Sequence, residues 1–147
     1  MDKTINIGQI MTTEVLYLHP EDIMDKVKDI FNKYDFHHLP VVNDNEEVVG
    51  IISKTDYFKL QHTFTMFKRK DSKAFNQAIF RSLLVKEVMT ESVVMLQPEE
   101  SIQLAMGVFR ENLFHAIPIV NEQKKLLGIL STYDLLNYAF KDEMLLQ

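Results

Sequence analysis

The feature that most constrains this chain is an internal duplication. Residues 50–56 read Gly-Ile-Ile-Ser-Lys-Thr-Asp, and residues 128–134 read Gly-Ile-Leu-Ser-Thr-Tyr-Asp. The offset between them is 128 − 50 = 78, and it holds without a gap from residue 7 to residue 58. It aligns Met11 with Met89, Pro20 with Pro98, Phe31 with Phe109, His37 with His115 and Pro40 with Pro118. One unit of roughly 50–60 residues is therefore used twice.

A single copy of this repeat is small for a stable domain. A chain of that size buries only about 60% of the surface that its unfolded form exposes. Two copies packed together bury more, and 147 residues fit one compact domain. We therefore expect the two copies to share a single hydrophobic core.

The composition excludes several classes of function. The formal net charge of −5 argues against binding to a phosphate backbone, which usually needs a basic face. The chain has no cysteine, so disulfides and thiolate metal sites are excluded. No apolar run approaches the roughly 20 residues that cross a bilayer, and residues 1–6 lack a signal pattern. We expect a cytoplasmic protein that binds neither DNA nor membranes.

Each copy predicts the same order of elements. In the first, residues 15–18 form a short strand, and a helix follows with Pro20 in its first turn. The apolar runs 39–42 and 48–52 flank a polar turn, which predicts a hairpin with strands covered on both faces. A second helix begins after Ser53, a suitable N-cap residue. The stripes expected on the first helix of each copy are Ile23, Val27, Ile30, Phe31 and Tyr34, and Ile102, Ala105, Met106, Phe109 and Leu113.

Residues 59–84 have no counterpart in the second copy. They mix aromatic and basic residues and contain neither proline nor glycine. This pattern predicts a continued helix, a bend near residues 70–73 and a second helix to about Leu83, with aromatic side chains packed on the core. We place the first motif at residues 7–60, a helical connector at 61–83 and the second motif at 84–141.

The repeated glycine, serine and aspartate form a set that could hold a ligand. A glycine inside a buried strand lets a ligand or a bulge approach the backbone. Ser53, together with the first N–H groups of a helix, is a natural seat for a phosphate. Asp56 follows one turn later on the same side, and its carboxylate suits the two hydroxyls of a ribose. The set therefore favours a cradle for a ribose-phosphate.

The same residues also fit a simpler role. A serine followed three residues later by an aspartate is a helix cap, and the carboxylate suits the positive end of the helix dipole. Capping alone would also tolerate Thr, Asn or Asp in place of the serine. Both copies keep Ser and Asp, although Lys54 of the first copy is replaced by Thr132 in the second. We therefore favour ligand binding over capping alone.

Three motifs recur in the same order in both copies. They are Ile10-Met11-Thr12 and Val88-Met89-Thr90, then Leu39-Pro40-Val41-Val42 and Ile117-Pro118-Ile119-Val120, then the two Gly-x-x-Ser-x-x-Asp endings. Together they resemble a tandem pair of CBS domains, often called a Bateman module, over residues 7–60 and 84–140. The resemblance implies an α/β (α+β) fold. Its two β-α-β-β-α units would be related by a pseudo-twofold axis and packed through their sheets.

The resemblance also implies a ligand and a site. CBS pairs bind adenosine-containing ligands in clefts between the two motifs: AMP, ADP, ATP, S-adenosylmethionine or, in some bacteria, cyclic dinucleotides. By similarity, the aspartates would hold ribose hydroxyls, the serines would face phosphate, and backbone at 13–15 and 91–93 would read the adenine edge. The expected ligand-binding residues are Thr13, Val15, His37, His38, Ser53, Lys54, Asp56, Glu91, Val93, His115, Ser131, Thr132 and Asp134.

The two equivalent histidines, His37 and His115, have two interpretations. Their position resembles that of a phosphate-contacting residue in the gamma subunit of the AMP-activated kinase. A histidine at the entry to a hairpin can equally face solvent. No close carboxylate recurs beside them, so neither a metal site nor a cofactor is expected.

The second copy carries fewer cations near the predicted site. Ala116 stands where the first copy has His38, and Thr132 stands where it has Lys54. A triphosphate needs several charge-assisted hydrogen bonds, and the chain has only three arginines. We therefore expect one strong site for a monophosphate or diphosphate, and one weak or empty site.

These observations favour a non-catalytic adenine-nucleotide sensor that transmits its ligand state to a separate protein, and the resemblance to CBS pairs implies that it forms a homodimer. The alternative is a ligand-free CBS module used for dimerisation or as a scaffold. An enzyme is not expected, because no nucleophile, base and orienting group occur together. No helix-turn-helix pattern points to DNA.

Overall fold

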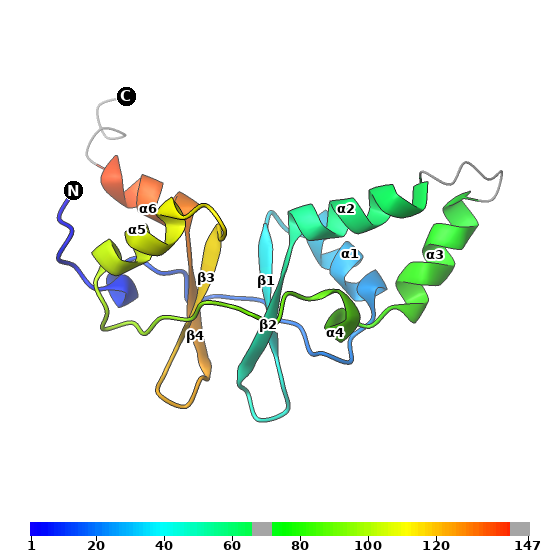
Figure 1. Cartoon of the computed structure of the whole chain (residues 1–147), viewed down its shortest axis with the longest axis horizontal. Coiled ribbons are helices and arrows are strands. Elements are labelled where there is room, and N and C mark those ends of the chain that lie inside the picture. The colour runs from blue at the N-terminus through cyan, green and yellow to red at the C-terminus, as the bar shows by residue number, and fades with distance from the viewer. Residues whose placement is uncertain (66–71, 142–147) are drawn as a thin grey trace. The chain divides into compact units, whose positions relative to one another are not determined.

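The computed structural model describes residues 1–65 and 72–141, which divide into two compact units. Unit 1 comprises Met1–Val15, Glu46–Val48 and the residues from Val93 on, and unit 2 comprises Leu16–Asn45 and Val49–Ser92. Figure 1 labels the helices and strands of each unit. Each unit contains segments from both copies of the repeat, which the sequence did not predict.

Unit 2 is built on the first hairpin. Strand β1 (His38–Val42) pairs with β2 (Val48–Ser53), and Leu18 adds one parallel bridge to Val41. Helix α3 lies against both α1 and α2 (Figure 1). The helices of this unit are α1 (Met24–Lys33), α2 (Lys54–Thr65), α3 (Ser72–Ser82) and α4 (Val85–Val88).

Unit 1 repeats this plan with shorter helices. Strands β3 (Ala116–Val120) and β4 (Leu126–Ser131) are antiparallel, and Leu96 adds a parallel bridge to Ile119. The helical elements are η1 (Ile7–Gln9), α5 (Ile102–Arg110) and α6 (Thr132–Ala139). The predicted α+β class is confirmed, but the first strand of each copy shrinks to one bridging residue. The packing of the two copies through their sheets stays a prediction.

The first residues of each copy lie in the unit that holds the hairpin of the other copy. We call residues 6–13 and 84–91 the lead segments. The first lies in unit 1 with the hairpin of the second copy, and the other lies in unit 2 with the hairpin of the first copy. Single-residue bridges hold them: Asn6 with Ser101, Thr12 with Ile129, Ile23 with Leu84, and Ile51 with Thr90. The offset of 78 relates the first pair to the third and the second pair to the fourth, so the exchange is symmetric.

Each unit has its own hydrophobic core. In unit 2, the rings of Phe31 from α1 and Phe80 from α3 each lie 5.7 Å from the ring of Tyr57. In unit 1, Ile117 and Leu130 of the hairpin pack with buried residues of α5. The described residues thus form two clusters, and the expected single shared core is wrong.

The apolar patterns predicted most of this burial. Every residue of β1 except the first is buried, as is all of β3, so the prediction of strands covered on both faces is confirmed for these two strands. Four of the six residues of β2 are buried, but only two of the six residues of β4 are, so the prediction is wrong for β4. Val27, Phe31, Ile102 and Ala105 are buried on the helix stripes. Leu113 was predicted to lie on the buried stripe of the second copy, and this prediction is wrong. Its side chain is 77% exposed because α5 ends at Arg110.

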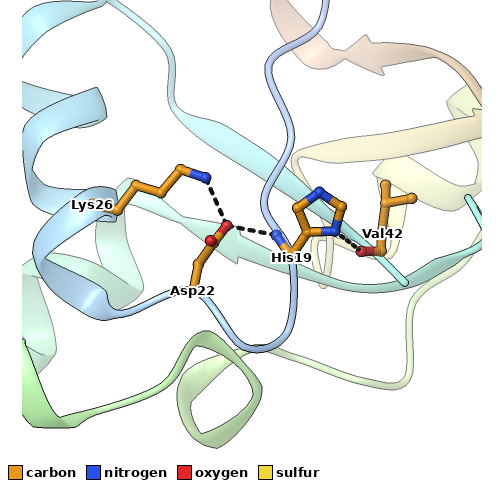
Figure 2. A network of polar contacts seen from close by, with 4 residues as sticks. All are labelled: His19, Asp22, Lys26 and Val42. Carbon is orange, nitrogen blue, oxygen red and sulfur yellow. Dashed lines mark hydrogen bonds and ion pairs between the residues drawn. The ribbon is translucent and has the colours of Figure 1, made fainter. Parts of the chain in front are cut away.

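Helix α1 begins later than predicted. Pro20 belongs to a turn ahead of the helix, in which Asp22 N–H donates to the carbonyl oxygen of His19 at 3.0 Å. Figure 2 shows the Asp22 carboxylate accepting hydrogen bonds from His19 N–H at 2.8 Å and from Lys26 Nζ at 2.9 Å. His19 Nδ1 lies 3.1 Å from the carbonyl oxygen of Val42, which ties this turn to β1. Burial opposes ionisation, but the hydrogen bonds outweigh it and hold the pKa of Asp22 below its ordinary value.

The two helices predicted for residues 59–84 are present where that stretch is described, and the division of the chain with a connector at 61–83 stays a prediction. Helix α2 continues to Thr65, and α3 forms the predicted second helix. Phe80 packs in the core, whereas Phe75 is 45% exposed, so only part of the predicted aromatic packing is correct. The predicted bend, the basic residues Lys68, Arg69 and Lys70, and the side chains of Phe64 and Phe67 lie outside what the structure describes.

Candidate ligand-binding site

The first turn of α2 organises the candidate site in unit 2. Ser53 ends β2, and its hydroxyl accepts a hydrogen bond from Asp56 N–H at 3.0 Å. In return, Asp56 Oδ2 accepts a hydrogen bond from Ser53 N–H at 3.4 Å. This reciprocal pair is a capping box. The residues predicted to bind a ligand therefore also begin the helix.

The equivalent turn in unit 1 is bonded more closely. Asp134 Oδ2 accepts hydrogen bonds from Ser131 N–H at 2.7 Å and from the Ser131 hydroxyl at 2.8 Å. Asp134 N–H donates back to that hydroxyl at 3.2 Å. The hydroxyl of Thr12, in the lead segment, donates to Asp134 Oδ1 at 3.3 Å. Both carboxylate oxygens of Asp134 are therefore in use within the chain.

Asp56 keeps one oxygen available. Among residues 1–65 and 72–141, its hydrogen bonds are the two with Ser53, and Oδ1 has no donor. The Ser53 hydroxyl accepts a hydrogen bond, but no acceptor for its own proton lies among the same residues. A free carboxylate oxygen and a free hydroxyl donor can bind a sugar hydroxyl and a phosphate oxygen. Unit 2 thus presents polar groups that unit 1 has already satisfied.

The helix starts offer less to an anion than predicted. Lys54 N–H donates to the carbonyl oxygen of His37 at 2.7 Å, and Asp56 N–H is used by Ser53. Within the described residues, only the Thr55 N–H remains free in this first turn. Unit 1 has the same arrangement, with Thr132 N–H donating to the carbonyl oxygen of His115 at 3.1 Å. The predicted phosphate seat is therefore reduced to one N–H in each unit.

Gly50 and Gly128 make room for the lead segments. A Cβ on Gly128 would lie 2.7 Å from the Thr12 carbonyl oxygen and 2.9 Å from Met11 Sδ. A Cβ on Gly50 would lie 2.6 Å from the sulfur of the equivalent methionine, Met89. The space beside each glycine is thus filled by the chain, and the expectation of a ligand there is wrong. The alternative expectation, a bulge, is met in the second copy, where the pairing shifts from Ile119 with Gly128 to Val120 with Leu126.

The exchange of lead segments regroups the predicted site residues. Thr13 lies in unit 1 with Asp134, whereas Glu91 lies in unit 2 with Asp56. Val15 and Val93 both belong to unit 1. Each acid is therefore accompanied by lead residues of the opposite copy. The role of residues 13–15 and 91–93 in reading an adenine edge stays a prediction.

The cationic side chains are distributed unequally, as the sequence indicated. Of the basic residues predicted to line the sites, unit 2 carries His37, His38 and the half-buried Lys54, and unit 1 carries His115, which is exposed. The His37 side chain is 68% exposed, and its Nε2 lies 3.8 Å from Asp35 Oδ1. The backbone of His37, rather than its ring, is fixed against α2. The part these side chains play in binding stays a prediction.

Sequence reasoning missed Thr12 and Thr90 as members of the two groups. Thr12 bridges to Ile129 of β4 and Thr90 bridges to Ile51 of β2, so each lies beside the strand that leads into a capping box. The signal that could have found them is the Met-Thr pair repeated at residues 11–12 and 89–90. In the sequence, this pair indicated only the family resemblance and no role in the site.

Other features of the described residues point to no different site. An open hollow of ≈ 270 Å³ is lined by Gln97, Pro98, Glu99, Asn121, Glu122, Gln123 and Leu127. It lies at the turn of the second hairpin, whereas Ser131 is at the other end of β4. In the described part of the chain, no three metal-ligating side chains cluster, and no helix has both the length and the apolar character to cross a membrane.

A family model of the CBS domain matches the chain twice, at residues 7–63 and 85–141. The two matches cover most of the chain and correspond to the two copies of the repeat. The resemblance proposed from the sequence is confirmed.

One curated relative is the inosine-5′-monophosphate dehydrogenase of Methanocaldococcus jannaschii. It is 25% identical over 128 residues, which is 87% of this chain but only 22% of that enzyme. The chain therefore spans about a fifth of the length of this relative.

Solved structures share the fold over most of the chain. CBSX2 from Arabidopsis thaliana has a TM-score of 0.79 at 22% identity, with 96% of this chain and 98% of that chain covered. CBSX2 has also been solved in complex with AMP, with a TM-score of 0.76. A CBS domain pair in complex with 5′-methylthioadenosine and S-adenosyl-L-methionine has a TM-score of 0.73 at 19% identity and covers 95% of this chain and 98% of its own.

Proposed function

The chain belongs to the CBS-domain family and carries two copies of the domain in tandem, and from this we propose that it is a non-catalytic sensor of an adenosine-containing ligand. AMP and S-adenosyl-L-methionine are bound by proteins of the same fold. We further propose that the chain acts as a homodimer and passes its ligand state to a separate protein.

The observation that carries this proposal is the free oxygen of Asp56. One oxygen of this carboxylate caps α2, while Oδ1 has no donor among the described residues. The neighbouring Ser53 hydroxyl has a free proton, and Lys54 supplies a cation one residue later. An acceptor for a sugar hydroxyl therefore lies beside donors suited to a phosphate. Unit 2 is accordingly proposed as the stronger site.

The ligand can be found by a thermal-shift panel on the full chain. AMP, ADP, ATP, S-adenosylmethionine and cyclic di-AMP would each be tested. A ligand present at a hundred times its dissociation constant adds about 2.7 kcal/mol to the free energy of unfolding. Isothermal titration with the best ligand should then give one strong site and one weak or silent site.

Asp56→Asn separates binding from capping. The amide oxygen can still accept the capping hydrogen bond from Ser53 N–H, whereas the free carboxylate oxygen is lost. We expect the variant to unfold at nearly the wild-type temperature without ligand, and to lose the ligand-induced shift at the strong site. Asp44→Asn, at an exposed turn position, is the matched control and should keep the shift. A full shift in Asp56→Asn would contradict the assignment of Asp56.

The second candidate is a ligand-free dimerisation or scaffold module. It is favoured by the capping boxes, because a cap alone accounts for the repeated serine and aspartate. This candidate predicts that no member of the panel moves the melting temperature, and that Asp56→Ala and Asp134→Ala only lower stability.

A further inference from the structure

The two acids of the repeat differ in one contact that the repeat itself does not require. Thr12 and Thr90 are equivalent by the offset of 78, and so are Asp134 and Asp56. In unit 1 the Thr12 hydroxyl donates to Asp134 Oδ1 at 3.3 Å. In unit 2 no described hydrogen bond joins Thr90 to Asp56. The chain thus contains a matched pair of sites, of which only one is closed by its own threonine.

We infer that the Thr12 hydroxyl is an internal competitor that occupies the ligand-facing oxygen of Asp134. This inference rests on the proposed function, because it assumes that Asp134 Oδ1 is the oxygen that would meet a ligand hydroxyl. A sugar hydroxyl would donate to that oxygen just as the threonine hydroxyl does. The ligand must therefore compete with Thr12 for the lone pairs of Asp134 Oδ1, whereas Asp56 Oδ1 has no donor among the described residues.

The surroundings of Asp134 make this competition effective. Its other oxygen, Oδ2, is held by Ser131 N–H and by the Ser131 hydroxyl, so it cannot be offered instead. The Thr12 backbone is fixed as well, because its N–H and its carbonyl oxygen both bond to Ile129 at 2.9 Å. The hydroxyl is therefore presented to Asp134 by a strand-like pair rather than by a loose loop. Thr12 is a positioning residue that sets the affinity of the site without adding to the cap.

The contact is long and solvent-exposed, so its effect is modest. Removing it should strengthen ligand binding at the Asp134 site by about two- to five-fold, which is roughly 0.5–1 kcal/mol at 1.4 kcal/mol per factor of ten. The Asp56 site should not change.

The test is an AMP titration of the full chain followed by amide nuclear magnetic resonance. The N–H signals of Ser131 and Ser53 report the two sites separately in one sample. Thr12→Val removes the hydroxyl and keeps the branched shape suited to the bridge with Ile129. Thr12→Ser restores a hydroxyl. Thr90→Val is the matched control on the other lead segment.

The expected result is a lower dissociation constant at Ser131 in Thr12→Val, a value closer to wild type in Thr12→Ser, and no change at Ser53. Thr90→Val should leave both constants unchanged. Unchanged binding at Ser131 in Thr12→Val overturns the inference and leaves the proposed function standing. Weaker binding there also overturns it, because Thr12 would then contact the ligand. If neither signal responds to AMP or to any other ligand of the panel, the proposed function fails and the inference falls with it.

Discussion

Gly128→Ala tests whether the first lead segment holds unit 1 together. The new Cβ would lie 2.7 Å from the Thr12 carbonyl oxygen, whereas ordinary contacts begin near 3.4 Å, so the shortfall is 3.4 − 2.7 = 0.7 Å. That carbonyl cannot withdraw alone, because it accepts a hydrogen bond from Ile129 N–H at 2.9 Å. Overpacking of this kind costs about 1–3 kcal/mol, and the reduced entropy of the unfolded chain offsets about 0.4–1 kcal/mol. We expect a net loss of about 1–2 kcal/mol.

The assay is urea unfolding followed by circular dichroism, with Gly107→Ala as the control. Gly107 lies within α5, and a Cβ there would meet nothing within 4 Å. The same substitution should therefore stabilise the protein by about 0.5–1 kcal/mol, because alanine is the better helix former. The two variants differ in the sign of the effect although the chemical change is identical.

Gly50→Ala should fall between these two variants. Its shortfall against the Thr90 carbonyl oxygen is 3.4 − 3.0 = 0.4 Å, and its nearest neighbour is the flexible end of Met89. If Gly128→Ala were as stable as wild type, or were stabilised like Gly107→Ala, the close crossing of the lead segment over β4 would be refuted. The proposed competition of Thr12 for Asp134 would lose its support as well.

Two further predictions concern the dependence of stability on pH. The pKa of Asp22 lies below its ordinary value of 3.8, so the stability it contributes is complete above that value and is lost as the pH falls below it. Asp22→Asn should therefore lower the free energy of unfolding measured in urea at pH 7, by about 1 kcal/mol or less for a partly exposed carboxylate, and change it little at pH 2. Burial raises the pKa of Tyr57, and the nearby carboxylates of Asp25 and Asp29 raise it further. The stability that the neutral Tyr57 contributes is therefore complete below the ordinary pKa of 10.0 and is lost as the pH rises above it. Tyr57→Phe should match wild type within about 1 kcal/mol at pH 8 and lose less stability at pH 11; an identical loss in both proteins would exclude Tyr57 as the cause.

The elements of each copy could be predicted because they depend on local pattern. The stripe through Val27 and Phe31 specifies a helix, and the apolar runs on either side of a polar turn specify a hairpin. The repeat indicates that both copies fold alike. Element boundaries were harder to predict. Pro20 was expected in the first turn of the helix, but it lies in a separate turn ahead of α1 that the Asp22 carboxylate holds through its bond to Lys26.

The exchange of the lead segments could not be predicted from local pattern. Each lead segment is held by single-residue bridges and by a close approach to a glycine. Neither kind of contact produces a periodic pattern of apolar residues in the sequence. Gly128 was interpreted as room for a ligand or a bulge, because local pattern could not place Met11 beside it. The expectation of one shared core failed for a related reason: total apolar content does not say how many clusters a chain divides it into.

The site was predicted at the level of residues but not of atoms. Ser53 and Asp56 do lie together at a helix start, as their spacing indicated. Which carboxylate oxygen is used and which is free depends on individual hydrogen bonds. A sequence motif specifies residues and does not specify which of their atoms are bonded. The difference between Asp56 and Asp134 arises from Thr12, which is 122 residues away from Asp134 in the sequence.

The crossed lead segments bear on how such a chain could have arisen. One copy of the repeat made alone would expose the glycine of its β-hairpin, and its own N-terminal stretch would have no hairpin to cover. Two separate copies would satisfy each other by trading those stretches, in the manner of a domain-swapped pair. Joining two genes end to end would then preserve, inside one polypeptide, an exchange that began between two.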